Sequence, residues 1–145
     1  MIIIILYLIL LATLHAKMEL MSEGKMGWGL RFPCWTINNR LINLLINKPL
    51  TGYHFYMLLM FLMLFHSPFL FISFTLKKEL TLMGLFFWYW IIEDFLWFVE
   101  SKHYGLRNFK KGRIYWHKRF WLFLPVSYWE SIIIGVSLLI LGKII

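Results

Sequence analysis

Four long hydrophobic runs divide the chain, and shorter segments carrying most of the charges separate them. The runs cover residues 2–16, 53–76, 80–99 and 120–141. A hydrocarbon core of about 30 Å needs roughly 20 helical residues, so the last three runs are long enough to cross it. The runs are continuously apolar rather than alternating, which predicts helices and excludes a membrane β-barrel. We therefore predict an all-α integral membrane protein with four transmembrane helices, forming a single membrane domain over residues 1–145.

The first run is short for a membrane span, because residues 2–16 would extend only about 22 Å as a helix. A cleaved signal peptide is the main alternative, but no Lys or Arg precedes Lys17 and no clear A-x-A-like site follows the run. A misassigned start codon would also explain the length. We predict that this run is a transmembrane helix.

The composition excludes the other broad classes of protein. The chain is 61% hydrophobic and only 15% charged, and its mean hydropathy is +0.70. A soluble domain of this size needs more polar residues to cover its surface. High apolar content argues against disorder, and a single cysteine excludes a disulfide scaffold within the chain.

The basic residues predict the orientation in the membrane. Residues 17–52 and 100–119 together hold twelve of the fifteen Lys and Arg, and the remaining three are Lys77, Lys78 and Lys143. The positive-inside rule then predicts that both segments are cytosolic and that both termini lie outside the cell membrane. This topology accounts for the net charge of +8, because basic cytosolic segments attract anionic lipid headgroups. We therefore expect membrane lipids as partners, and no nucleic acid is needed to explain the charge.

A short helix is expected between the first and second runs. Within residues 36–47, Ile37, Leu41, Leu44 and Leu45 fall on one face, and asparagines fall on the other. This pattern predicts a helix lying in the membrane interface. A loop helix folded onto the bundle is an equally good interpretation.

Three carboxylates lie inside the hydrophobic runs, namely Glu93, Asp94 and Glu130. Each would cost about 2.5–3.5 kcal/mol near the centre of a bilayer, so they need partners inside the protein. Helical rise puts all three in the cytosolic third of the membrane. We therefore predict that they meet there, with help from the 100–119 loop and the neighbouring runs. The candidate binding site comprises Glu93, Asp94, Glu130, His54, His103, His117, Arg113 and Trp97.

Three functions are compatible with such a site. The leading hypothesis is binding of a lipid headgroup, a cation or a membrane partner, either another subunit or a second copy of the chain. The second is a metal-dependent enzyme acting on a lipid or isoprenoid, because carboxylates and imidazoles suit Zn, Fe or Mn. The chain has no H-E-x-x-H motif to support a divalent metal as cofactor. The third is a structural or assembly subunit, in which the carboxylates pair with Arg107, Arg113, Arg119 or tryptophan N–H groups.

Overall fold

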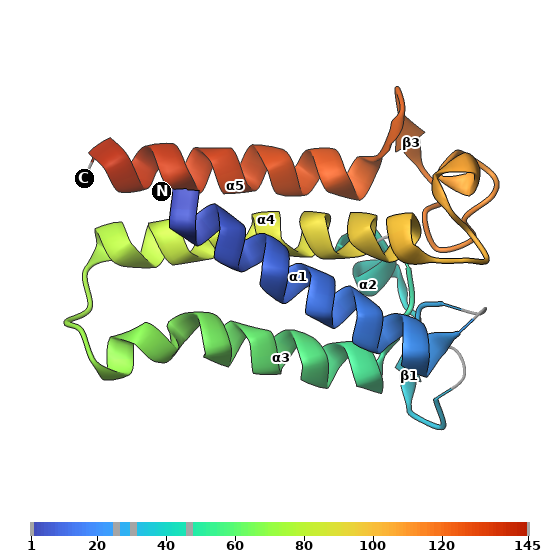
Figure 1. The fold of residues 1–145 in the computed structure, drawn as a ribbon, viewed down its shortest axis with the longest axis horizontal. Coiled ribbons are helices and arrows are strands. Elements are labelled where there is room, and N and C mark those ends of the chain that lie inside the picture. Colours follow the sequence, from blue (N-terminus) through green and yellow to red (C-terminus); the bar gives the residue numbers. More distant parts are fainter. Residues whose placement is uncertain (1, 25–26, 30–31, 46–47, 145) are drawn as a thin grey trace.

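Four long helices dominate the computed structural model, which describes residues 2–24, 27–29, 32–45 and 48–144 (Figure 1). They are α1 (Ile2–Glu23), α3 (Gly52–His66, continued by the 3₁₀ helix η1, Ser67–Leu70), α4 (Leu76–Glu100) and α5 (Val126–Ile144). Among the described residues, these four are long and apolar enough to cross a membrane. Exposed apolar side chains cover the outside of each helix, which suits contact with lipid. The prediction of a helical, multi-pass membrane fold is confirmed at this level.

Helix α4 is the centre of the bundle, because it packs against α1, α3 and α5. A short connection, residues 71–75, joins η1 to α4, and Thr75 caps α4 by accepting a hydrogen bond from Lys78 N–H. The two termini lie at the same end of the bundle as this connection (Figure 1). We call the opposite end, where α1 and α4 finish and α3 and α5 begin, the loop end. Which side of a membrane it faces stays a prediction.

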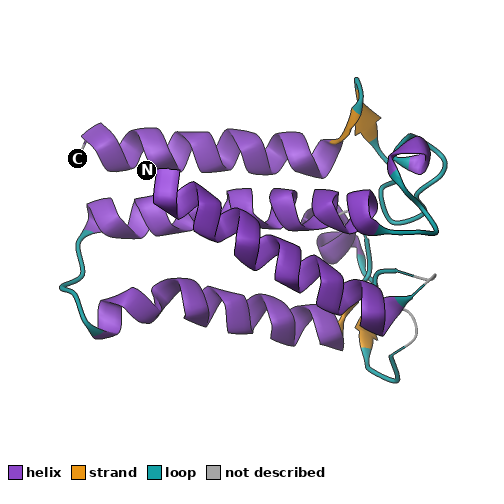
Figure 2. Ribbon diagram, viewed as in Figure 1, coloured by secondary structure: helices purple, strands orange, loops and turns teal. Residues whose placement is uncertain are grey.

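Small elements gather at the loop end (Figure 2). They are β1 (Thr36–Ile37), α2 (Arg40–Leu45), β2 (Leu50–Thr51), η2 (Leu106–Asn108), β3 (Phe120–Trp121) and β4 (Leu124–Pro125). The strands form two antiparallel pairs, β1 with β2 and β3 with β4. Helix α2 falls inside the predicted 36–47 segment, and its position in a membrane interface stays a prediction.

Several helix boundaries differ from those expected. The second span ends with η1 at Leu70 rather than at residue 76, and α4 begins at Leu76 rather than at residue 80. Helix α1 continues past Ala16 to Glu23, because Glu19 and Glu23 face protein rather than solvent. Its 22 residues span about 33 Å, so it is not the short helix predicted from residues 2–16. Helix α5 begins at Val126 rather than near residue 120, because residues 120–125 form the β3–β4 hairpin.

Two buried clusters fix the helices around α4. The first joins α1, α3 and α4 in the middle of the bundle and is centred on Phe61 and Tyr89. The second lies at the loop end, where Trp97 and Phe98 of α4 pack against Trp116 of the following segment. His15 of α1 and Glu93 and Asp94 of α4, which are described next, lie between these two clusters in sequence.

Candidate functional site

Three polar residues of α1 share one buried face. His15, Glu19 and Glu23 follow one another at intervals of four, which stacks their side chains on one side of a helix. All three are almost fully enclosed, with exposed fractions of 5%, 6% and 2%. Burying acidic groups this deeply is costly unless another group neutralises or binds them.

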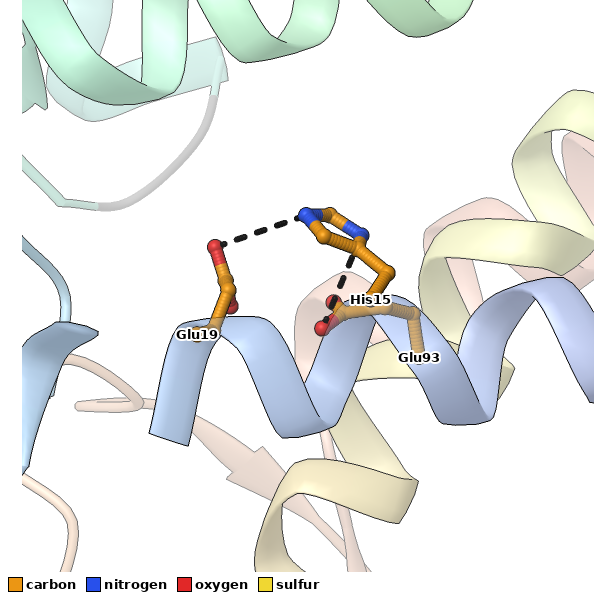
Figure 3. Close-up of side chains that lie close together, drawn as sticks. All are labelled: His15, Glu19 and Glu93. Atoms are coloured by element: carbon orange, nitrogen blue, oxygen red, sulfur yellow. Dashed lines mark ion pairs between the residues drawn. The ribbon is translucent and has the colours of Figure 1, made fainter. Parts of the chain in front are cut away.

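The first cluster joins α1 to α4 through His15, Glu19 and Glu93. His15 Nε2 lies 3.8 Å from Glu19 Oε1, and His15 Nδ1 lies 3.8 Å from Glu93 Oε1 (Figure 3). The carboxyl groups of Glu19 and Glu93 are also within reach of each other. In the described part of the chain, no hydrogen bond reaches Oε1 of either glutamate. Two buried carboxylates therefore face one imidazole with unsatisfied oxygens.

The second cluster joins α1 to α3 through Glu19, Glu23 and His54. His54 Nε2 lies 3.7 Å from Glu23 Oε1, and this oxygen also accepts a hydrogen bond from Gly29 N–H. In each cluster, one potential ligand atom from each residue lies within 4.8 Å of the others. Glu19 belongs to both clusters, so five side chains form one continuous group.

Both histidines are held by a hydroxyl group at Nδ1. His54 Nδ1 lies 2.7 Å from Thr51 Oγ1, and His15 Nδ1 lies 2.8 Å from the Tyr89 hydroxyl oxygen. Thr51 is also the N-cap of α3, because its Oγ1 accepts from His54 N–H. When Nδ1 of His54 carries the proton and donates it to Thr51 Oγ1, Nε2 keeps its lone pair on the side of Glu23. His15 differs, because its Nδ1 faces Glu93 and its Nε2 lies 2.8 Å from Met57 Sδ as well as facing Glu19. Histidine ligands of metals are commonly oriented in this way by a second hydrogen bond.

The segment between α1 and α3 covers the second cluster. Trp28 stacks on His54 with ring centroids 3.7 Å apart, and the Lys48 ammonium lies 3.2 Å from the centroid of the Trp28 ring. Gly27, Trp28 and Gly29 all have left-handed backbone conformations, which the flanking glycines adopt readily and which costs more for tryptophan. Burial lowers the pKa of Lys48, and the nearby carboxylates oppose this shift. This lysine is the basic side chain next to the group.

Asp94 lies next to Glu93 in sequence but belongs to a different network. Its Oδ2 lies 2.9 Å from His117 Nε2 and accepts a hydrogen bond from the Tyr128 hydroxyl. His117 and Tyr128 are both buried. Asp94 therefore connects α4 to the segment after it and to α5, with protein groups already occupying the carboxylate.

The structure brings together some of the predicted site residues. Glu93 and His54 both lie in the five-residue group, while Asp94 and His117 form the neighbouring pair. Trp97 is buried against Trp116, and within the described residues its indole N–H has no acceptor.

Three predicted residues lie elsewhere, since His103, Arg113 and Glu130 are exposed. Because α5 begins at Val126, Glu130 falls in its second turn, beside a surface pocket of about 500 Å³ that Lys118 and Arg119 also line. The expectation that Glu130 meets the two acids of α4 does not match this placement.

Sequence reasoning missed Glu19 and Glu23 and left His15 out of the candidate site. Their signal is a H-x₃-E-x₃-E spacing, which puts three potential ligands on one helix face. Hydropathy ends the first run at Ala16, which places the two glutamates in the polar segment that follows it.

The five grouped residues offer two imidazoles and three carboxylates. This mixture suits divalent first-row metals such as Zn, Mn and Fe, whereas Ca and Mg favour oxygen ligands alone. Each cluster supplies three protein ligands, which is the number typical of a metal site that keeps a coordination position open. No protein-family model, curated protein or solved structure matches this chain.

Proposed function

We propose that the protein binds a divalent first-row transition metal ion at the loop end of its helical bundle. The ligands are the grouped side chains of α1, α3 and α4: His15, Glu19, Glu23, His54 and Glu93. The observation that carries the proposal is that Oε1 of Glu19 and Oε1 of Glu93 are buried and, in the ranges described, accept no hydrogen bond. Both lie beside the imidazole of His15.

Charge supports a cation at this position. Buried carboxylates that face each other must be neutralised by a proton or by a cation, because like charges repel strongly in a medium of low dielectric constant. Lys48 is the basic side chain near the three grouped glutamates and Asp94, and its burial disfavours the charged ammonium. A divalent ion would bind the free oxygens directly, which a lysine held over an indole ring does not do.

The histidines favour a metal ion over a shared proton. A proton between Glu19 and Glu93 would satisfy those two carboxyl groups and would need no imidazole. The structure instead has two histidines whose Nδ1 atoms are each held by a hydroxyl group, on either side of Glu19. The concentration of Lys and Arg in the two long connections supports a cytosolic position for this end of the bundle.

Metal analysis tests the proposal directly. The protein is purified in detergent, dialysed to equilibrium against micromolar Mn²⁺ or Zn²⁺, and analysed by mass spectrometry of the elements. We expect at least one bound ion per chain in the wild type and a loss of at least tenfold in affinity in Glu93→Gln. Glu130→Gln is the matched control, because it removes an exposed glutamate from the neighbouring helix. A wild type without metal, or equal binding by Glu93→Gln, would overturn the proposal.

A metal-dependent membrane enzyme acting on a lipid or isoprenoid is a second candidate function. It is favoured by the count of three protein ligands in each cluster, since catalytic metals keep a position for water or substrate. Electron paramagnetic resonance of the Mn²⁺-loaded protein in ¹⁷O-labelled water tests this point. Line broadening by a bound water supports an open position, and its absence counts against catalysis.

A further inference from the structure

We infer that the centre holds two metal ions and that the carboxylate of Glu19 bridges them. This inference rests on the proposed metal binding and adds the number of ions and the role of one residue. Its basis is that the two clusters, His15–Glu19–Glu93 and Glu19–Glu23–His54, have only Glu19 in common.

The spacing along α1 argues against a single ion bound by all five residues. His15 and Glu23 are eight positions apart, which corresponds to about 12 Å along a helix axis. Metal–ligand bonds to nitrogen and oxygen are only about 2.0–2.2 Å long. Side chains can bend toward each other, but one ion would have to draw in ligands from both ends of this stretch. Two ions need no such movement, because the ligand atoms of each cluster already lie within 4.8 Å of one another.

Glu19 is suited to the bridging position. It lies one helical turn from His15 on one side and one turn from Glu23 on the other. A carboxylate has two oxygens and can therefore bind one ion with each. In enzymes with two metal ions, the ions are commonly about 3.5–4 Å apart, a separation that a bridging carboxylate can span.

The ligands divide evenly between the two ions. His15 and Glu93 complete the first site, while Glu23 and His54 complete the second. Each ion thus receives one imidazole, one carboxylate of its own and a share of Glu19. Two divalent ions also bring four positive charges close to the carboxylates of Glu19, Glu23 and Glu93.

Stoichiometry and spin coupling test the inference on the intact chain. The detergent-solubilised wild type is titrated with Mn²⁺, bound ions are counted by elemental analysis, and electron paramagnetic resonance is recorded at saturation. We expect two Mn²⁺ per chain and the multiline spectrum of an exchange-coupled pair. One uncoupled Mn²⁺ per chain would overturn the bridged pair and leave the proposed function standing. No bound Mn²⁺ or Zn²⁺ would remove both.

Single variants identify which residues belong to which ion. We expect His54→Ala to reduce the count from two to one and to abolish the coupling. His15→Ala should do the same through the other site, and Glu19→Gln should weaken both sites at least tenfold. His103→Ala is the matched control, since this histidine is exposed and should leave two coupled ions. If Glu19→Gln retained a coupled pair, the bridging role would be wrong, whatever the other variants showed.

Discussion

Glu93 and Asp94 are adjacent in sequence, yet they face different regions of the molecule. Neighbouring positions of a helix point about 100° apart, so Glu93 faces α1 while Asp94 faces the segment after α4 and the start of α5. Asp94 is held by an imidazole and a phenol hydroxyl. Glu93 Oε1 faces an imidazole beyond hydrogen-bond distance and, among the residues described, accepts no hydrogen bond.

The difference separates two uses of a buried acid. Protein groups already satisfy Asp94. Its role is therefore structural, because it connects α4 to the segment after it and to α5. The environment of Glu93 is incomplete without a proton or a cation, because further carboxylates lie beside it. Burial alone therefore does not identify the ligand site, and the distinguishing feature is an acceptor without a donor.

The largest expected effect on stability comes from replacing Asp94. Asp94→Ala leaves the buried His117 imidazole and the buried Tyr128 hydroxyl without their shared acceptor, and each buried polar group left unsatisfied costs about 1–3 kcal/mol. We expect a large fall in the midpoint of thermal unfolding in detergent. Glu93→Gln in metal-free protein should unfold at or above the wild-type midpoint, because it removes a charge from a cluster of like charges. Equal destabilisation by the two variants would contradict the distinction between the two acids.

Bound metal should stabilise the protein through the Glu93 cluster and should not depend on the Asp94 network. A ligand present at a hundred times its dissociation constant stabilises the folded state by about 2.7 kcal/mol. We expect saturating Mn²⁺ to raise the unfolding midpoint of the wild type and of Tyr128→Phe, but not that of Glu93→Gln. The increase should shrink as the pH falls, since protons compete with the ion for carboxylates and imidazoles. An equal increase in all three proteins would indicate a nonspecific effect.

The membrane fold could be predicted from the sequence because it depends on long apolar runs that no soluble fold would need. Hydropathy located the spans within residues 53–76 and 80–99, but the charged residues between these runs, Lys77, Lys78 and Glu79, lie in the first turn of α4 rather than in the connection. The start of α1 was found in the same way, but its end was not. Hydropathy measures contact with lipid, and residues 17–23 are helical because part of this stretch faces protein.

The site was predicted only in part, for a related reason. Glu93 and His54 could be selected because a buried acid and a histidine at a span end are unusual in any membrane sequence. Their partners on α1 required knowing that this helix continues and which face packs on α4. Glu130 was wrongly included in the group because depth along a helix was estimated without the β3–β4 hairpin, which shifts the start of α5.

A smaller effect on metal affinity should come from removing the contact that orients His54, while all the proposed ligands stay in place. Thr51→Val removes the hydroxyl beside His54 Nδ1 and should weaken metal binding about tenfold, the lower range for loss of an orienting contact. It also removes a helix cap, which costs about 1 kcal/mol. Thr75→Val is the matched control, because Thr75 caps α4 at the other end of the bundle. It should lower stability by a similar amount and leave the metal affinity unchanged, so equal affinities in the two variants would exclude the orienting role.

The smallest effect is expected for the predicted site residues that lie at the surface. Glu130→Gln changes an exposed carboxylate on α5, beside Lys118 and Arg119, and surface substitutions away from special contacts have little effect on stability. We expect both the unfolding midpoint and the Mn²⁺ stoichiometry to stay at their wild-type values in the detergent-purified protein. A loss of metal in this variant would mean that Glu130 reaches an ion, which in a single chain its exposed position does not allow. Such a result would therefore place a ligand from a second copy in the centre, and the contrast between satisfied and unsatisfied acids would no longer apply within one chain.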